Sequence, residues 1–328
     1  MRRFSYHVAA DAVEAARLGA EGSALRKAGG TDLLDRMKEG LERPATVVGM
    51  HRALPTGLRR EGEWLWIGAG TTLAELGRSA ELRRLLPSLA ESAGEAATPA
   101  IREAATLGGN LFQRPRCWYF RSRHYLCRKK GGAVCWAQEG RHEHHALFDN
   151  DHCAVVHPAN AAPALIAAGA VLHLVGGDGR RRQLPLAEAY TPAGDDPEVE
   201  HRLAADEIVV EVAVPAAALG PRSAHVEIRH KQSFDWPLAM AAANLNGRPG
   251  LVLGAVASTP RPVPLPEPPP ADEPGLREWA AAAARRAVAD ATPLPGNAWR
   301  LRPARAAAER ALLRAAGLAV DPGRKEER

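Results

Sequence analysis

The side chains with the most evident chemistry in this sequence are four cysteines that share one stretch of the chain. They are Cys117, Cys127, Cys135 and Cys153, with nine, seven and seventeen residues between successive ones, and the rest of the 328-residue chain contains none. Cysteine used only as a small core residue would be scattered. Four thiols grouped between Arg114 and Cys153 therefore indicate a metal centre or disulfides.

The same stretch is strongly basic. It holds eight Arg and Lys residues against four Asp and Glu residues, so its net charge of +4 makes up most of the +5 of the whole chain. Thiolates around a metal centre carry negative charge, and nearby cations offset the cost of burying it. The basic residues are Arg114, Arg116, Arg121, Arg123, Arg128, Lys129, Lys130 and Arg141.

Three kinds of site could use these cysteines: an iron–sulfur cluster, a zinc ion or two disulfides. Structural zinc sites usually contain cysteine pairs with two to four intervening residues, and the sequence has no such pair. Disulfides require an oxidising compartment. A four-cysteine cluster is therefore favoured, and the other two readings stay open. Histidines of the stretch, which we interpret mainly as a solvated loop, are alternative ligands: His124, His142, His144, His145 and His152.

Two glycine pairs suggest a site for a phosphate group. Residues 29–30 precede a helical pattern, and residues 108–109 follow a short predicted helix. Glycine permits positive φ and close backbone approach, and a helix N-terminus presents free N–H groups to an anion. One pair alone indicates only a turn, with Asp32 as a helix cap, but two such loops could hold one pyrophosphate. The usual dinucleotide fingerprint G-x-G-x-x-G with a distant acid is absent.

Strand and helix patterns alternate around these loops, which predicts an α+β fold. Strands are expected at residues 46–48 and 64–67, a hairpin at 171–184 and a long strand at 207–215. Residues 97–102 contain Thr98 followed by proline, a typical helix start. Other elements predicted in this part are a helix at 11–18 capped by Asp11, a helix at 81–93 and a strand edge at 154–158. The last third is predicted to contain strands near 226–231, 239–245 and 251–257 and helices near 276–289 and 304–316.

Composition excludes several classes of function. Basic and acidic residues nearly balance outside the cysteine stretch, which argues against nucleic-acid binding despite a pI near 9.2. No apolar run reaches the roughly 18 residues that a membrane span needs. Residues 1–14 become acidic before any apolar segment, so no signal peptide is expected and the chain alone is predicted to be cytoplasmic.

Several of these strings resemble the flavin subunit of the molybdenum hydroxylases, the family of xanthine, carbon monoxide and aldehyde dehydrogenases. The strings are residues 28–33, residues 97–110, residues 207–210 and Lys231. The resemblance implies an α+β fold with a two-lobed FAD-binding domain of the vanillyl-alcohol-oxidase type at residues 1–216. Its lobes are expected at about 1–54 and 55–216, with the cysteine stretch 114–153 as an insertion. A C-terminal domain of antiparallel strands and helices is expected at 222–320, as in the carbon monoxide dehydrogenase flavoprotein, and a frayed tail at 321–328.

The same resemblance implies which residues bind FAD. Val209 and Lys231 match positions that contact the isoalloxazine ring, where a cation stabilises the reduced flavin; a solvated lysine at a strand end is the alternative. Asn160 stands where the family often has aspartate, so its contact to the flavin lacks a charge. The implied cofactor-binding residues are Ala28, Gly29, Gly30, Thr31, Asp32, Leu33, Thr106, Leu107, Gly108, Gly109, Asn110, Asn160, Val209 and Lys231.

The cysteine insertion is similar to the branch of three-subunit aldehyde oxidoreductases whose flavin subunit also carries a [4Fe-4S] cluster. Its ligands would be Cys117, Cys127, Cys135 and Cys153. The implied function is an oxidoreductase subunit that passes electrons from a molybdopterin-binding large subunit and a [2Fe-2S] small subunit, through FAD, to an external acceptor. No residue of this chain is expected to contact the organic substrate. A signal-bearing partner could carry such a complex to the periplasm.

Three further readings remain from the sequence. One is the flavin subunit of a complex like hydroxybenzoyl-CoA reductase, which has a related insertion. Another is a non-catalytic iron–sulfur or zinc scaffold whose flavin loops are relics. The third is a free-standing flavin oxidase. The flavin and metal content of the purified protein distinguishes the scaffold from the flavin-containing readings. Co-purification of partner subunits argues against the free-standing flavin oxidase.

Overall fold

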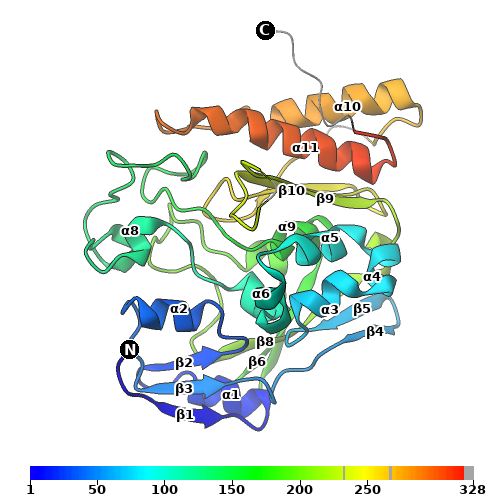
Figure 1. The fold of residues 1–328 in the computed structure, drawn as a ribbon. Coiled ribbons are helices and arrows are strands. Elements are labelled where there is room, and N and C mark those ends of the chain that lie inside the picture. Colours follow the sequence, from blue (N-terminus) through cyan, green and yellow to red (C-terminus); the bar gives the residue numbers. More distant parts are fainter. Residues whose placement is uncertain (232, 266–267, 321–328) are drawn as a thin grey trace.

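The chain is described by a computed structural model that covers residues 1–231, 233–265 and 268–320 (Figure 1). The described residues form three β-sheets, which lie in residues 5–49, 58–215 and 223–262. Helices pack on each sheet, so the predicted α+β class is confirmed. Within these ranges, no helix combines the length and apolar character that a membrane crossing requires. The predicted frayed tail at 321–328 lies outside the described residues.

The first sheet has three parallel strands in the order β1-β3-β2. Parallel neighbours need a crossover connection, and two short helices provide it. The predicted Asp11 cap is confirmed, because its carboxylate accepts a hydrogen bond from the N–H of Glu14 at 2.9 Å. The elements are β1 (Ser5–Val8), α1 (Ala12–Leu18), β2 (Ala24–Lys27), α2 (Leu33–Lys38) and β3 (Thr46–Gly49).

The second sheet has five antiparallel strands in the order β4-β5-β8-β6-β7, and it shares a large apolar core with a group of helices. The predicted hairpin 171–184 and strand 207–215 are confirmed. The strands are β4 (Leu58–Glu61), β5 (Trp64–Gly68), β6 (Val171–Gly176), β7 (Arg181–Pro185) and β8 (Glu207–Pro215). The helices are α3 (Leu73–Arg78), α4 (Ala80–Leu85), α5 (Pro87–Glu95), α7 (Leu107–Leu111) and α9 (Ala161–Ala167), and the neighbouring α6 (Pro99–Ala104) contributes no buried residue.

Two local predictions in this lobe are corrected. The single helix expected at 81–93 is divided into α4 and α5, because Pro87 lacks the N–H that would continue α4 and instead begins α5. The strand edge expected at 154–158 does not form, since the N–H of His157 bonds a single loop carbonyl, that of Ala257, rather than a strand. The predicted Thr98 cap is confirmed by its hydrogen bond from the N–H of Ile101.

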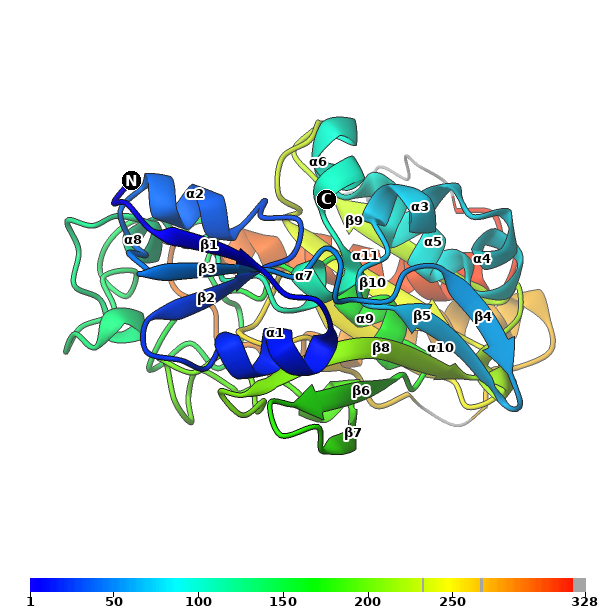
Figure 2. The same ribbon diagram turned by 90° about the horizontal axis from the view of Figure 1, so that it is seen from below.

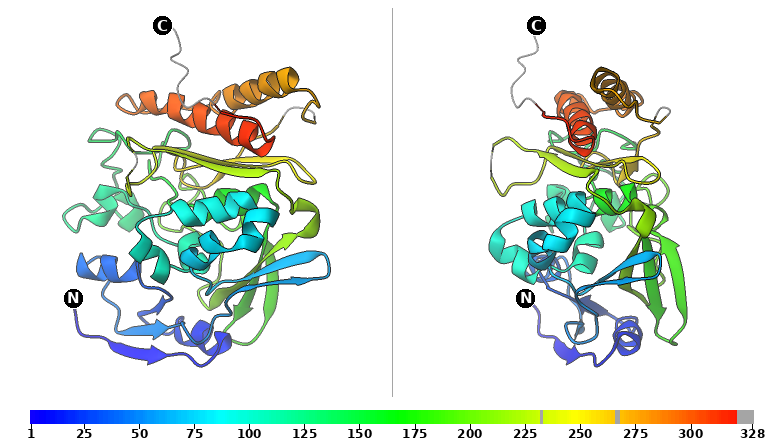
Figure 3. Two further views of the ribbon diagram at one scale, coloured as in Figure 1. Left: turned by 45° about the vertical axis from the view of Figure 1, so that its right-hand side comes forward. Right: turned by 90° about the vertical axis from the view of Figure 1, so that its right-hand side faces the viewer.

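The third sheet has the strand order β12-β11-β10-β9 and is covered on both faces. Helices α10 and α11 lie over its outer side, and α5 and α9 of the second lobe pack on its inner side (Figures 1 and 3). The elements are β9 (Ser223–Ile228), β10 (Ala239–Asn244), β11 (Gly250–Gly254), β12 (Arg261–Pro262), α10 (Glu273–Arg286) and α11 (Leu301–Ala315).

The cysteine stretch lies along one side of the molecule, between the first sheet and the C-terminal helices (Figure 1). It contains only α8 (Trp118–Arg121) and the one-turn helix η1 (Arg128–Lys130). Its end is fixed to the loop that follows β11, where the N–H of Leu147 donates to the carbonyl of Val256 at 2.7 Å. Asn297 adds hydrogen bonds from its side chain to the carbonyls of His145 and Ala146. The end of the insertion is therefore hydrogen-bonded to segments that come much later in the sequence.

Candidate flavin and cysteine sites

The first predicted glycine loop packs against residues 104–105, which lead directly into the second glycine loop and α7 (Figure 2). A Cβ on Gly29 would lie 1.8 Å from the carbonyl oxygen of Ala104 and 3.2 Å from the Cα of Ala105. Only glycine permits this backbone approach. Gly29 is thus required to pack the β2–α2 loop against the segment that leads into α7.

The two loops differ in the N–H groups that they offer to an anion. Those of Leu107 and Gly108 donate to the carbonyls of Thr71 and Ala69, and that of Gly109 donates to the hydroxyl of Thr106. By contrast, the N–H groups of residues 29–32 donate to no acceptor among the residues that the structure describes. Gly30 has φ of +82°. Free donors for a pyrophosphate are therefore found on the first loop, at the start of α2.

Both loops border one cavity of about 110 Å³. Of the predicted cofactor residues, Thr31, Gly109, Asn110 and Asn160 line it. Gly109 is exposed there, and a Cβ on it would meet only the hydroxyl oxygen of Thr106, at 3.0 Å. The cavity thus joins free N–H donors, an open glycine face and two amide side chains, which fits the phosphates and polar edges of a flavin nucleotide.

Other predicted cofactor residues lie away from this cavity. The side chains of Leu33, Leu107 and Val209 are buried in apolar cores, so only their backbones could reach a ligand. Lys231 lines a separate surface pocket beyond the end of β9. Ala28 packs partly against the core of the first lobe.

Sequence reasoning missed several residues of the cavity. Arg229, two residues before Lys231, lines it and is held by the Glu95 carbonyl at 2.8 Å and by the carboxylate of Glu227. The sequence shows only that a second cation lies close to Lys231. It does not show which of the two side chains faces the cavity. Other lining residues not predicted are Gln113, Arg116, Phe234 and Trp236.

Asp32 has a role that the sequence did not indicate. It occupies the N-cap position of α2 but makes no capping hydrogen bond with its side chain. Its carboxylate instead pairs with Arg36 at 3.1 Å, with Arg121 at 2.7 Å and with Arg116. The N–H of Arg114 also donates to it, at 3.2 Å. The first glycine loop is therefore tied to the start of the cysteine insertion by ion pairs that are only 11–23% exposed.

We expect Asp32→Asn to lower the free energy of unfolding by about 2–3 kcal/mol, because it leaves partly buried arginines without their counter-charge. Urea unfolding followed by circular dichroism measures this change. Asp35→Asn is the matched control on the same helix, since the Asp35 carboxylate is 57% exposed and 3.5 Å from Arg121; its cost should stay within about 1 kcal/mol. Equal effects of the two variants would contradict the structural role of Asp32.

The four cysteines line one small cavity inside the insertion. Cys127, Cys135 and Cys153 are buried, Cys117 is partly buried, and all four thiols are free. Burial raises the pKa of Cys117 to about 11. The pKa of Cys135 is lowered, chiefly because the Cys153 thiol donates a hydrogen bond to it. The structure thus brings together thiols that are up to 36 residues apart, from Cys117 to Cys153.

Fewer cations surround the cysteines than the composition suggested. Arg128 and Lys129 line the cavity, and the ammonium of Lys129 also pairs with Glu200 at 3.2 Å. The three arginines nearest the start of the insertion turn away to Asp32, Glu42 and Glu200 instead. Within the described residues, no group of three or more His, Cys, Asp or Glu side chains is arranged to hold a single metal ion.

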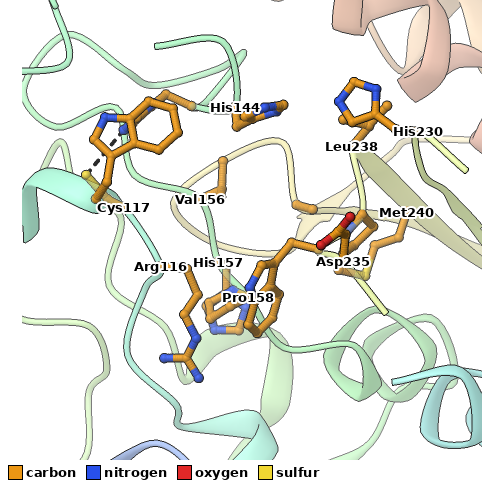
Figure 4. Close-up of a pocket in the computed structure, with 15 residues that line it drawn as sticks. Arg116, Cys117, His144, Val156, His157, Pro158, His230, Asp235, Leu238 and Met240 are labelled. Atoms are coloured by element: carbon orange, nitrogen blue, oxygen red, sulfur yellow. Dashed lines mark hydrogen bonds between the residues drawn. The ribbon is translucent and has the colours of Figure 1, made fainter. Parts of the chain in front are cut away.

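A third and larger cavity, of about 300 Å³, adjoins the other two, and its lining residues are drawn in Figure 4. It shares Arg116 and Trp236 with the glycine-loop cavity, and Cys117 and His145 with the cysteine cavity. The ring nitrogen Nε2 of His145 is 3.2 Å from the Cys117 sulfur. Cys117 and His145 thus form a shared wall between the large cavity and the cysteines.

His157, which lines this large cavity, makes stability depend on pH. Burial lowers its pKa to about 3, with the charge of Lys129 as a smaller cause. The folded protein keeps the ring neutral, while the unfolded chain takes up a proton below about pH 6.5. The free energy of unfolding therefore decreases as the pH falls below about 6.5. We expect His157→Phe to reduce this loss by about 1.4 kcal/mol per pH unit.

Unfolding in urea at a series of pH values measures the effect of His157→Phe. Tyr190→Phe is the control, because its ring packs on His157 with centroids 4.4 Å apart and the variant keeps the histidine. An unchanged pH slope in His157→Phe, or an equal change in both variants, would contradict the assignment.

A parallel lobe and an antiparallel lobe whose glycine loops meet over an amide-lined cavity define a flavin- or nucleotide-binding protein. Comparison with known families makes this specific: residues 2–217 match the FAD binding domain in molybdopterin dehydrogenase. The chain belongs to this family of oxidoreductase components. The family supports FAD as the cofactor.

Individual relatives agree with this assignment. The chain is 32% identical to the aldehyde oxidoreductase FAD-binding subunit PaoB of Escherichia coli over 71% of this chain and 74% of that protein. It is 29% identical to the carbon monoxide dehydrogenase medium chain of Hydrogenophaga pseudoflava, over 73% and 68% of the two chains. A solved structure of carbon monoxide dehydrogenase from that organism matches with a TM-score of 0.71 and 26% identity, and the match covers 96% of this chain and 98% of the other.

Proposed function

We propose that this chain is the FAD- and [4Fe-4S]-carrying electron-transfer subunit of a molybdenum-containing oxidoreductase of the aldehyde or xanthine type. The observation that carries the proposal is that four cysteines line one cavity in a chain of this FAD-binding family. Two relatives are named as a subunit and a medium chain, which supports assembly with partner subunits; from the family resemblance we infer a [2Fe-2S] small subunit and a molybdopterin-binding large subunit.

The residues of the chain have distinct tasks in this function. The free N–H groups of residues 29–32 would bind the pyrophosphate, while Asn110 and Asn160 offer polar contacts at the cavity wall. Cys117, Cys127, Cys135 and Cys153 would hold the cluster. Bound FAD supplies the ability to take up electrons one at a time and release them in pairs. The ion pairs of Asp32 keep the two binding regions in a fixed relation.

Cofactor analysis of the purified complex tests this function. We expect one FAD and about four irons per copy of this chain, together with co-purification of two further subunits. Anaerobic addition of an aldehyde or an N-heterocycle should bleach the flavin absorbance band. A colourless protein that contains zinc would instead support the scaffold reading, and an active monomer would support a free-standing flavin oxidase.

A further inference from the structure

We propose that the large cavity between the glycine loops and the cysteines binds a planar aromatic electron acceptor of the quinone class; this rests on the proposed function. The cavity is lined by the aromatic rings of Trp118 and Trp236 and by apolar groups such as Pro158 and Met240, with Asp235 among its polar residues. Aromatic and apolar walls with a few placed polar groups are typical of small-molecule sites. Such walls suit a flat ring better than a charged metabolite.

The lining of the large cavity also holds polar side chains, among them two histidines and an arginine. The imidazoles of His144 and His230 belong to the lining and contact one another edge to face, with ring centroids 5.6 Å apart (Figure 4). Across the cavity, the guanidinium of Arg116 lies over the Trp236 ring, 5.0 Å from its centroid. That guanidinium donates hydrogen bonds to Asp32 and Gln113, so Arg116 contributes its charge and its stacking on Trp236, and the imidazoles of His144 and His230 are the hydrogen-bonding groups for a ligand. His230 is exposed, which gives protons a route from solvent.

The position of the cavity indicates why its ligand should be redox-active. Arg116 and Trp236 also line the glycine-loop cavity, and Cys117 also lines the cysteine cavity. A ligand here would contact residues of both cofactor sites. Reduction of a quinone to a hydroquinone consumes two electrons and two protons. Bound FAD in its anionic reduced form (FADH⁻) would supply both electrons and one proton, and His230 would pass the second proton from solvent.

Two variants test the site without altering the predicted FAD or cluster ligands. Val156 is half-buried, lines the large cavity but neither of the others, and lies at its centre in Figure 4. Val156→Trp should fill the space and abolish binding of 2-heptyl-4-hydroxyquinoline N-oxide, a redox-inactive quinone analogue, as measured by calorimetry on the FAD-loaded complex. His230→Ala should weaken that binding about fivefold through loss of a hydrogen bond. Val134→Trp and His124→Ala are matched controls at exposed positions of the insertion.

Kinetics separate this inference from the proposed function. In both variants the KM for menadione should rise about fivefold or more, while FAD content, flavin reduction by substrate and reoxidation by ferricyanide stay at the wild-type level. A flat titration of the wild-type complex, or unchanged binding by Val156→Trp, would overturn the quinone site alone. Release of FAD by the analogue would show that the cavity belongs to the flavin, which also overturns it. A wild-type complex that contains no FAD would overturn the proposed function itself.

Discussion

Gly109→Val is expected to remove FAD from the purified protein while leaving the protein folded. Gly109 presents an open face to the cavity beside the first glycine loop, and a Cβ there meets only the hydroxyl of Thr106, at 3.0 Å. The valine side chain would therefore occupy space that FAD needs. We expect FAD affinity to fall about 10- to 100-fold, in line with the 1–3 kcal/mol that overpacking a fitted site costs.

Flavin content per chain after gel filtration measures the effect of Gly109→Val, and the unfolding midpoint tests whether the fold is kept. Gly194→Val is a suitable control, because Gly194 is exposed, has open space where a Cβ would stand and lies outside the cavity. Full flavin occupancy in Gly109→Val would show that the pyrophosphate does not approach this glycine.

Cys127→Ser should remove about four irons per chain while FAD stays bound, because serine is a poor replacement for one of four cluster thiolates. Cys127 is 5% exposed and lines the cysteine cavity, and serine has nearly its volume, so the loop itself should keep its shape. The variant therefore tests the metal site rather than the fold.

Iron analysis and the visible absorbance of the cluster are the measurements for Cys127→Ser. Val134→Ser changes a half-exposed residue of the same loop and should keep all its iron. If Cys127→Ser retains its iron, Cys127 is not a ligand. If it loses flavin together with iron, the two sites are coupled more tightly than the separate cavities suggest.

Local signals in the sequence predicted local structure well. Asp11 and Thr98 were identified as helix caps because a cap depends on residues only three positions apart. The division of the helix near Pro87 was missed, although proline is a known helix breaker. The glycine pairs were predicted as loops, but which pair keeps free N–H groups depends on Ala69 and Thr71, whose carbonyls are brought to α7 only by the fold.

Ion pairs between residues that are far apart in the sequence could not be predicted. Asp32 and Arg121 are 89 positions apart, and nothing in either local pattern marks them as partners. The high positive charge of the insertion suggests compensation for a metal centre. In the structure, however, several of its arginines form ion pairs with carboxylates outside the insertion. Likewise, the sequence does not distinguish the cations Arg229 and Lys231. Arg229 lines the glycine-loop cavity because of where β9 ends.

The attachment of the insertion to the far end of the chain has a consequence for biosynthesis. The loop that carries His145 is held by hydrogen bonds from Asn297 and Arg300, and Leu294 packs against the cluster of side chains that includes Cys117 and Cys135. The cysteines therefore leave the ribosome well before the residues that fix their loop. Under the proposed cluster function, metal insertion should accordingly follow synthesis of residues 294–300, and a nascent or truncated protein that ends before Leu294 would leave these thiols open to the wrong metals.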